Sequence, residues 1–334
     1  MDHLFKTGEI NSIDYWNQRL FTDWIAEGGR KQTAFFAGMC CAELPEWLVE
    51  EMRARRLSIL DYGCALGDAL PVFRQAFAAS PIRGADVAEA GLGLARALYP
   101  DFEFSRVDPT EAAPPPADIV YCSNTLEHFD NWPEILSDVA RRATEYVLIV
   151  VPFEEDEPIA EHVCTFELDS LPSVLDTGMR LLHLSVVNVA DDPQTYWNGR
   201  QLIAVYGKER RDNRKPTEPL CRAGKHSLAV DLRSLDNDAV AALLLGTATL
   251  SRERRRLAQG AVEAAGTRAE KSEARERAAT AEAEKQRNLA DRMKRQRDGA
   301  QLAAAEAVHA EIAKLRKEQA GAEQLARKRG EQIE

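Results

Sequence analysis

Residues 59–68 read Ile-Leu-Asp-Tyr-Gly-Cys-Ala-Leu-Gly-Asp. The apolar residues that open this stretch predict a buried strand, and the strand ends at an acidic residue, Asp61. A turn that contains Gly63 and Gly67 follows, and the next residues can begin a helix. Glycine permits backbone angles and a close ligand approach that a Cβ atom would obstruct. The stretch therefore predicts the first strand, ligand-binding loop and first helix of an open α/β sheet, with Asp61 at the sheet edge where such folds bind ligands.

The glycine spacing discriminates between two classes of cofactor. A dinucleotide-binding loop has the pattern Gly-x-Gly-x-x-Gly, which places a pyrophosphate on a helix N-terminus. Started at Gly63, that pattern meets Ala65 and Asp68 where it requires glycine. The carboxylates of Asp61 and Asp68 would also repel a pyrophosphate. These residues disfavour an NAD-dependent oxidoreductase and favour a ligand that carries cationic groups.

The same stretch resembles motif I of the class I S-adenosylmethionine (SAM) methyltransferases, Asp-x-Gly-x-Gly-x-Gly, with Ala65 in place of the middle glycine. An ordinary strand-to-helix turn is the alternative interpretation of these residues. The resemblance implies SAM as cofactor and a site that includes Asp61, Gly63, Cys64, Ala65 and Gly67. The methyl group of Ala65 is expected to narrow the space for the methionine part of SAM.

A second strand is predicted at 82–87 and carries Asp86 about 20 residues beyond the loop; Asp86 and the next residue, Val87, are assigned to the cofactor site. A carboxylate there can accept two hydrogen bonds from the vicinal diol of a ribose. Asp86 matches motif II of the methyltransferases; its alternative role is to cap the next helix. Asp108, after a predicted third strand at 102–107, is expected from the resemblance to hold the adenine amino group, although a solvated loop residue is nearly as good an interpretation.

A fourth strand is predicted at 117–123, and Asn124-Thr125-Leu126-Glu127-His128 follows it. This segment resembles motif IV and its extension in methyltransferases of the ubiquinone-biosynthesis type. The ends of the first and fourth strands meet at the switch point of such a sheet. Ser123 and Asn124 are therefore assigned to the cofactor site, Glu127 to the substrate and His128 to catalysis.

His162 is a second candidate base, because the resembling family often carries a histidine near the acceptor site. Residues 168–176 are predicted to form a helix after it. Near the N-terminus, Asn11-Ser12 can cap a predicted helix whose apolar stripe includes Ile13, Trp16, Leu20 and Trp24. This helix either packs on the sheet or covers the acceptor; the second interpretation makes Trp16 a substrate contact. The acidic run 154–157 is interpreted as a solvated loop, with a cationic acceptor or a metal as the alternative, and no metal ligand is assigned.

Composition sets further limits. The 334 residues carry a formal net charge of −11 and include six cysteines without a Cys-x-x-Cys pair, which gives no support for a zinc or thioredoxin-type site. The acidic body argues against nucleic acid as a partner. Neither a signal peptide nor a transmembrane segment is recognised in the sequence, so a cytoplasmic protein is expected.

The last part of the chain has a different composition. From Ser251 onward there is no Pro, Phe, Trp, Tyr or Cys, and the segment contains 20 Lys and Arg residues and 15 Asp and Glu residues. Heptad-like apolar spacing predicts a coiled coil that joins copies of this chain or recruits a partner protein; a solvated helix or a partly disordered tail is the alternative. The expected domains are an N-terminal helical cover (1–54), a methyltransferase domain (55–207), a linker with a short helix (208–250) and the coiled-coil tail (251–334).

The resemblance implies a doubly wound, seven-stranded, mostly parallel α/β sheet with one antiparallel strand, the Rossmann-like methyltransferase fold. It also implies an enzyme of EC 2.1.1 type that moves a methyl group from SAM to an oxygen or nitrogen of a small-molecule or glycan acceptor. The long tail resembles that of bacterial enzymes that modify growing surface polysaccharides. A non-catalytic, methyltransferase-like scaffold that recruits partners through the coil is the alternative.

Overall fold

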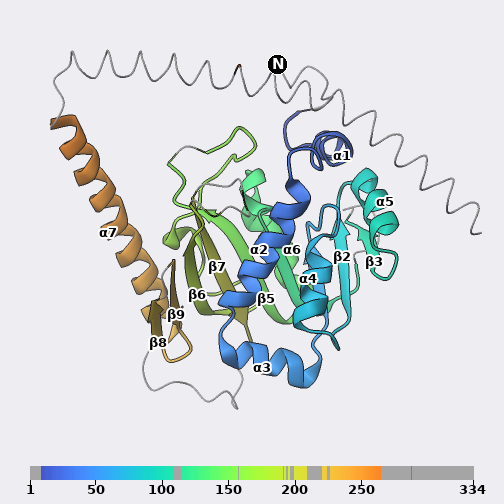
Figure 1. Ribbon diagram of the computed structural model, residues 1–334. Coiled ribbons are helices and arrows are strands. Elements are labelled where there is room, and N and C mark those ends of the chain that lie inside the picture. The colour runs from blue at the N-terminus through green and yellow to red at the C-terminus, as the bar shows by residue number, and fades with distance from the viewer. Residues whose placement is uncertain are drawn as a thin grey trace, which may run out of the picture. The chain divides into compact units, whose positions relative to one another are not determined.

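The computed structural model describes residues 9–107, 114–156, 158–190, 192, 195, 199–208, 220–223, 226–264 and 287. The chain divides into two units, 1–255 and 256–334. The first unit contains the sheet and the helices that surround it (Figure 1). Most of the second unit lies outside the described residues. The same is true of most of the predicted coiled-coil tail (251–334), of which only 251–264 and residue 287 are described.

Within the described residues the sheet has nine strands in the order β3-β2-β1-β4-β5-β7-β6-β9-β8. The strands are β1 (Ile59–Tyr62), β2 (Ile82–Asp86), β3 (Glu103–Arg106), β4 (Ala117–Ser123), β5 (Ala143–Phe153), β6 (Arg180–Asn188), β7 (Arg200–Gly207), β8 (Leu220–Ala223) and β9 (Ser227–Asp231). The first five pair in parallel, and β7 runs antiparallel between β5 and β6. The strand order reverses between β1 and β4, so their carboxyl ends form the edge where open α/β sheets bind ligands.

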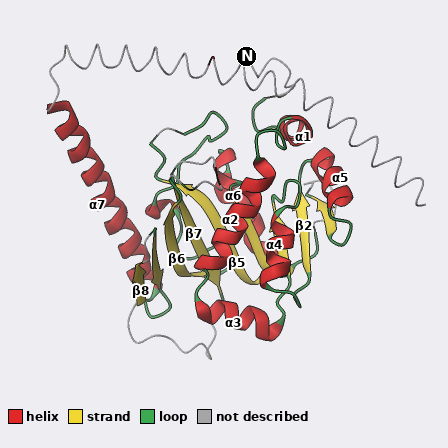
Figure 2. Cartoon of the chain, viewed as in Figure 1, coloured by secondary structure: helices red, strands yellow, loops and turns green. Residues whose placement is uncertain are grey.

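Alternate residues of the central strands supply two separate cores. On one face, Ile59 and Tyr121 pack with α2 (Gly29–Glu43), α3 (Glu46–Arg55) and α4 (Ala69–Ala76). On the other face, Leu60 and Val147 pack with α6 (Trp132–Arg142) and with α7 (Asn237–Ala264). Figure 2 shows helices on both sides of the sheet, the layered arrangement that a mostly parallel sheet requires because neither of its faces can meet water.

The N-terminal segment adds α1 (Ile13–Thr22), which packs against α5 (Glu89–Leu98). Ser12 caps α1 by accepting a hydrogen bond from the Tyr15 N–H at 3.1 Å, as its sequence position predicts. Tyr15 and Leu20 are buried in the structure, whereas Ile13, which the predicted apolar stripe included, is 43% exposed.

The structure corrects two further predictions. Residues 208–250 were expected to be a linker and a short helix, but β8 and β9 lie within this range and extend the sheet from seven strands to nine by pairing beyond β6. Residues 168–176 form only a short 3-10 turn, η3 (Leu168–Ser170), instead of a helix. Pro172 explains the second difference, because it disfavours the helical conformation of the residue before it, and Leu171 is extended with ψ 128°.

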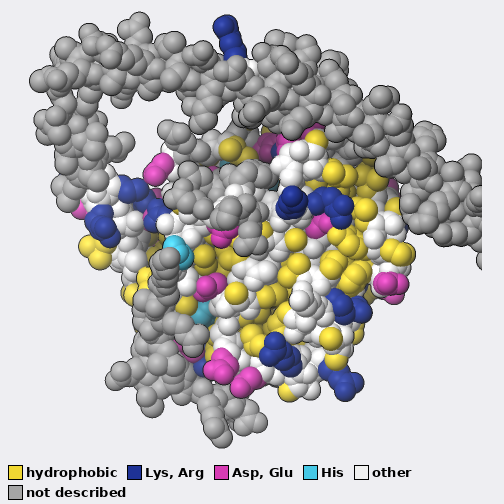
Figure 3. Space-filling model, viewed as in Figure 1, with side chains coloured by type: hydrophobic (Ala, Val, Ile, Leu, Met, Phe, Trp, Pro, Cys, Tyr) yellow, Lys and Arg dark blue, Asp and Glu magenta, His cyan; other side chains and the backbone are white. Residues whose placement is uncertain are grey.

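The described surface carries charges of both signs. On the face drawn in Figure 3, acidic and basic side chains are interspersed with apolar ones. Among the described residues, none of the helices combines the length and the hydropathy that a membrane crossing requires.

Candidate functional site

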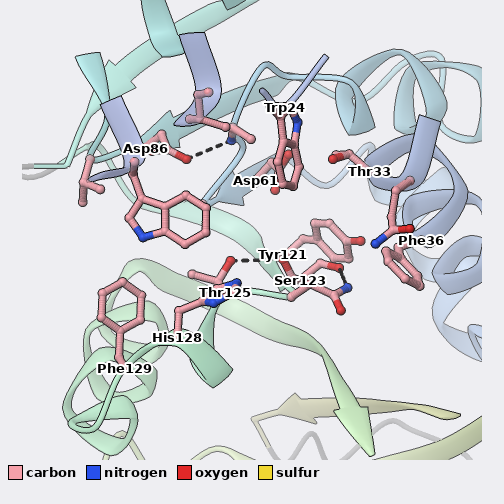
Figure 4. Close-up of a pocket in the computed structure, with 17 residues that line it drawn as sticks. Trp24, Thr33, Phe36, Asp61, Asp86, Tyr121, Ser123, Thr125, His128 and Phe129 are labelled. Atoms are coloured by element: carbon pink, nitrogen blue, oxygen red, sulfur yellow. Dashed lines mark hydrogen bonds between the residues drawn. The ribbon is translucent and has the colours of Figure 1, made fainter. Parts of the chain in front are cut away.

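A hollow lies at the carboxyl ends of β1, β2 and β4, where the sequence predicts the cofactor site (Figure 4). The space between its lining residues, open mouth included, is about 780 Å³. Seventeen residues line it: Trp16, Leu20, Trp24, Gln32, Thr33, Phe36, Asp61, Gly63, Ala65, Asp86, Val87, Tyr121, Ser123, Asn124, Thr125, His128 and Phe129.

The loop after β1 adopts a left-handed backbone at three positions. Gly63 and Gly67 have φ of 85° and 80°, which glycine adopts without penalty. A Cβ atom on Gly63 would lie 2.5 Å from the Thr125 Oγ1, so only glycine fits beside the segment after β4. Ala65 has φ 49°, a left-handed value at the position where the motif has glycine. A residue with a Cβ adopts this conformation only at a conformational cost.

Asp86 ends β2 and holds the loop in place. Its Oδ2 accepts a hydrogen bond from the Ala65 N–H at 2.8 Å, and its Oδ1 accepts one from the Ala88 N–H at 2.9 Å. Each carboxylate oxygen can accept a further bond, so both can still serve a diol in the hollow. Burial raises the pKa of Asp86 to about 6.

Asp61 gives the hollow its electrostatic character. Its side chain is nearly inaccessible, and burial, together with the charge of Asp86, raises its pKa to about 8. The described lining has two carboxylates and no Lys or Arg. A ligand with cationic groups would stabilise these carboxylates, whereas a pyrophosphate would meet two like charges. The residues present therefore fit SAM and do not fit a dinucleotide.

The segment after β4 closes another side of the hollow. Asn124 has φ 47°, a value that asparagine tolerates, and its N–H donates to the Val150 carbonyl oxygen at 2.8 Å. Its Nδ2 donates to the Ser123 Oγ at 3.0 Å. In Figure 4 Ser123 lies next to Tyr121, across the hollow from Trp24.

Trp16 and His128 meet at one end of the hollow. Their ring centroids are 4.8 Å apart in an edge-to-face arrangement. The His128 Nδ1 lies 2.9 Å from the Glu161 carbonyl oxygen, which can only accept, so Nδ1 carries a proton. Burial lowers the pKa of His128 to about 4, and the ring is therefore neutral near pH 7.

Some predicted site residues lie elsewhere. Cys64 is fully buried behind the loop, and Gly67 packs against Phe104, where a Cβ would lie 2.7 Å from the ring. Glu127 is buried beneath the rim, and His162 lies next to His128 rather than in the lining. The prediction that Asp108 holds the adenine concerns a residue outside the described part of the chain.

The lining also includes residues that the sequence analysis missed. Gln32, Thr33 and Phe36 share one face of α2, a helix without a clear amphipathic pattern and therefore without a sequence signal. Trp24 follows α1 and was assigned only to the apolar stripe. Thr125 and Phe129 lie close in sequence to the Glu127-His128 pair. This closeness to the motif was the one sequence feature that could have indicated that they line the hollow.

The strand order, the helices on both faces and the position of the hollow define an α/β, Rossmann-like methyltransferase fold with a mostly parallel sheet. Residues 35–200 match a family model described as a methyltransferase domain. SAM, the cofactor predicted from the sequence, is the cofactor of this methyltransferase domain.

Solved structures of methyltransferases are similar to the chain at low identity. Magnesium protoporphyrin IX methyltransferase from Synechocystis, with bound SAH, is 15% identical over 62% of this chain and 92% of its own, with a TM-score of 0.39. The mitomycin 7-O-methyltransferase is 14% identical over 58% and 60%, with a TM-score of 0.42. A SAM-dependent methyltransferase from Aquifex aeolicus is 18% identical over 49% and 94%, with a TM-score of 0.35. No curated protein matches the chain.

Proposed function

We propose that the chain is a SAM-dependent methyltransferase that transfers a methyl group to an oxygen or nitrogen of a small-molecule acceptor. The observation that carries the proposal is the pair of buried carboxylates, Asp61 and Asp86, that line one hollow above the Gly63 turn. Asp86 would accept hydrogen bonds from the ribose hydroxyls, and Asp61 would lie near the cationic part of the cofactor.

SAM supplies a methyl group that its sulfonium already activates. The protein's part is then to align the acceptor and to exclude water. Trp16, Trp24 and Phe129 are suited to exclusion, because they place aromatic surface around the hollow. A hydroxyl acceptor must also lose a proton. His128 lines the hollow and His162 adjoins it, so these residues are the proposed proton acceptors.

The acceptor class is the finer part of the proposal. A sugar hydroxyl of a glycan, within surface polysaccharide biosynthesis, is supported only by the predicted helical tail and its likeness to polysaccharide-modifying enzymes. The polar lining residues Gln32, Thr33 and Ser123 offer hydrogen-bonding groups to a hydroxylated acceptor. A cytoplasmic location and an assembly through the coiled coil stay predictions.

A scaffold without catalytic activity is the second candidate function. The observation that favours it is Ala65, whose φ of 49° is costly for a residue other than glycine. A thermal-shift experiment separates the two functions, because a ligand that binds the native state raises its melting temperature. The methyltransferase proposal predicts a rise of several degrees with millimolar SAM or SAH and none with NAD. An unchanged melting temperature with all three would favour the scaffold.

A further inference from the structure

Three potential metal ligands gather beneath one end of the hollow. Glu127 and His128 lie on a 3-10 turn, η2 (Leu126–His128), after β4, and His162 lies in the segment after β5. One ligand atom from each of the three side chains can be chosen so that all lie within 4.8 Å of one another. The backbone holds the two segments together, because the N–H of Val163 donates to the Glu127 carbonyl oxygen at 2.9 Å.

Glu127 is the feature that requires an explanation. Its side chain is fully buried, and neither of its carboxylate oxygens has a hydrogen-bond partner among the described residues. An ionised carboxylate in this environment would lack a compensating charge, which is strongly unfavourable. The neutral carboxyl group would bury an O–H without an acceptor, which also costs free energy. A cation at this position would satisfy the group in its ionised form.

Each of the two histidines has an oxygen atom next to its Nδ1, as metal-binding histidines usually do. The Nδ1 of His162 lies 2.8 Å from the Glu155 Oε1, and both of these side chains are almost inaccessible. The Nδ1–H of His128 donates to the Glu161 carbonyl oxygen at 2.9 Å. A carboxylate or carbonyl on one ring nitrogen fixes the tautomer that presents the other nitrogen to a metal. The ring centroids of the two histidines are 5.2 Å apart.

We propose that Glu127, His128 and His162 bind one divalent transition-metal ion, with Glu155 as the carboxylate that positions His162. Two imidazoles and one carboxylate suit zinc, iron or cobalt better than magnesium or calcium, which prefer oxygen ligands. Ligand atoms around a tetrahedral ion with bonds of about 2.1 Å are roughly 3.4 Å apart, so small side-chain rotations would complete the site.

The ion would lie at the edge of the hollow, because His128 is shared between the cluster and the lining. Three protein ligands leave at least one coordination position for a water molecule or an acceptor oxygen. With the ion bound, His128 and His162 are ligands rather than proton acceptors. Metal binding needs neither SAM nor turnover, so this inference and the methyltransferase proposal can fail separately.

The test is a Co²⁺ titration of the full chain after treatment with a chelator and desalting. Visible absorption reports the coordination of Co²⁺, and elemental analysis after dialysis gives the stoichiometry. We expect one ion per chain in the wild-type protein. Glu127→Gln and His162→Asn should each bind at least about 10-fold more weakly, because each removes a ligand. Glu127→Gln is close to isosteric and removes a carboxylate without partners, so it should fold.

His226→Asn is the matched control, since His226 is exposed and its backbone carbonyl makes the contact to Asn188. It should bind Co²⁺ like the wild-type protein. Circular dichroism establishes whether each variant is folded. If only one of Glu127→Gln and His162→Asn folds, that variant alone is sufficient for the test. The inference is overturned if the wild-type chain shows no saturable binding, or if a folded Glu127→Gln or His162→Asn protein binds Co²⁺ as tightly as the control.

Discussion

Ala65 is the residue at which the loop departs from the methyltransferase motif, and its effect can be measured. A left-handed conformation costs a non-glycine residue about 1–2 kcal/mol, whereas glycine costs about 0.5–1 kcal/mol in unfolded-chain entropy. Because Ala65 has a φ of 49°, its replacement in Ala65→Gly should raise the free energy of unfolding by up to about 1 kcal/mol in a urea titration. Ala95→Gly in the interior of α5 is the control and should lower it by about 1 kcal/mol. Equal losses in both variants would contradict the strain at Ala65.

Asp61 predicts a pH dependence of stability. Its pKa is about 8 in the folded protein and about 3.9 when unfolded, so the folded state binds the additional proton between these values. Stability conferred by the protonated carboxyl is full below pH 4 and is lost as the pH rises through 8. Between pH 5 and pH 8, without SAM, Asp61→Asn should lose less unfolding free energy than the wild-type protein, by more than about 1 kcal/mol. Identical losses in urea titrations would show that Asp61 is not buried as described.

At the residue scale, the sequence predicted some of the residues that line the hollow, while their roles toward SAM stay predictions. Asp61, Gly63 and Asp86 follow strands or form a turn, so their places depend on short-range pattern alone. Cys64 alternates to the opposite side of the same loop and is buried there. The burial of the Glu127 carboxylate without a hydrogen-bond partner depends on the packing of the segments around residues 127 and 163, which no local pattern specifies.

Among the elements, strands with a clear pattern of apolar residues in the sequence were predicted well. The strand predicted at 117–123 agrees with β4. α2 was missed because it begins at a Gly-Gly pair and lacks a clear apolar stripe. β8 and β9 were missed because they lie in a stretch rich in charges and prolines, and their pairing with β6 is a tertiary contact.

The helix α1 is held to the body by Glu161. The Tyr15 hydroxyl donates to its carboxylate, and the Arg19 Nε lies 2.8 Å from the same group. Glu161→Gln would weaken this buried contact by about 1–3 kcal/mol, so trypsin should cleave after Arg19 several-fold faster. Glu89→Gln is the control, because its ion pair with Arg96 is exposed. A cleavage rate that both substitutions leave unchanged would mean that Glu161 does not fix α1.

At the scale of the whole molecule, the start of α7 belongs to the sheet unit. Val240 and Leu244 are buried in one core, and Arg252 pairs with Glu167 and Asp169 at 2.5 Å. The coiled-coil tail is predicted from Ser251 onward, so most of it follows this anchor. A chain that ends after Ala264 should therefore keep its affinity for SAM but sediment as a monomer, whereas the full chain sediments as an oligomer. Equal masses in analytical ultracentrifugation would contradict the predicted coil.

The central claim is that SAM binds in the hollow with Asp86 on its ribose. Calorimetric titration of SAM into the full chain and into Asp86→Ala tests this most directly. The account predicts saturable binding with one SAM per wild-type chain, and at least about 10-fold weaker binding to the folded variant, since two hydrogen bonds to a charged group are lost. Equal affinity of the two proteins, or no binding to the wild-type chain at millimolar SAM, would contradict it.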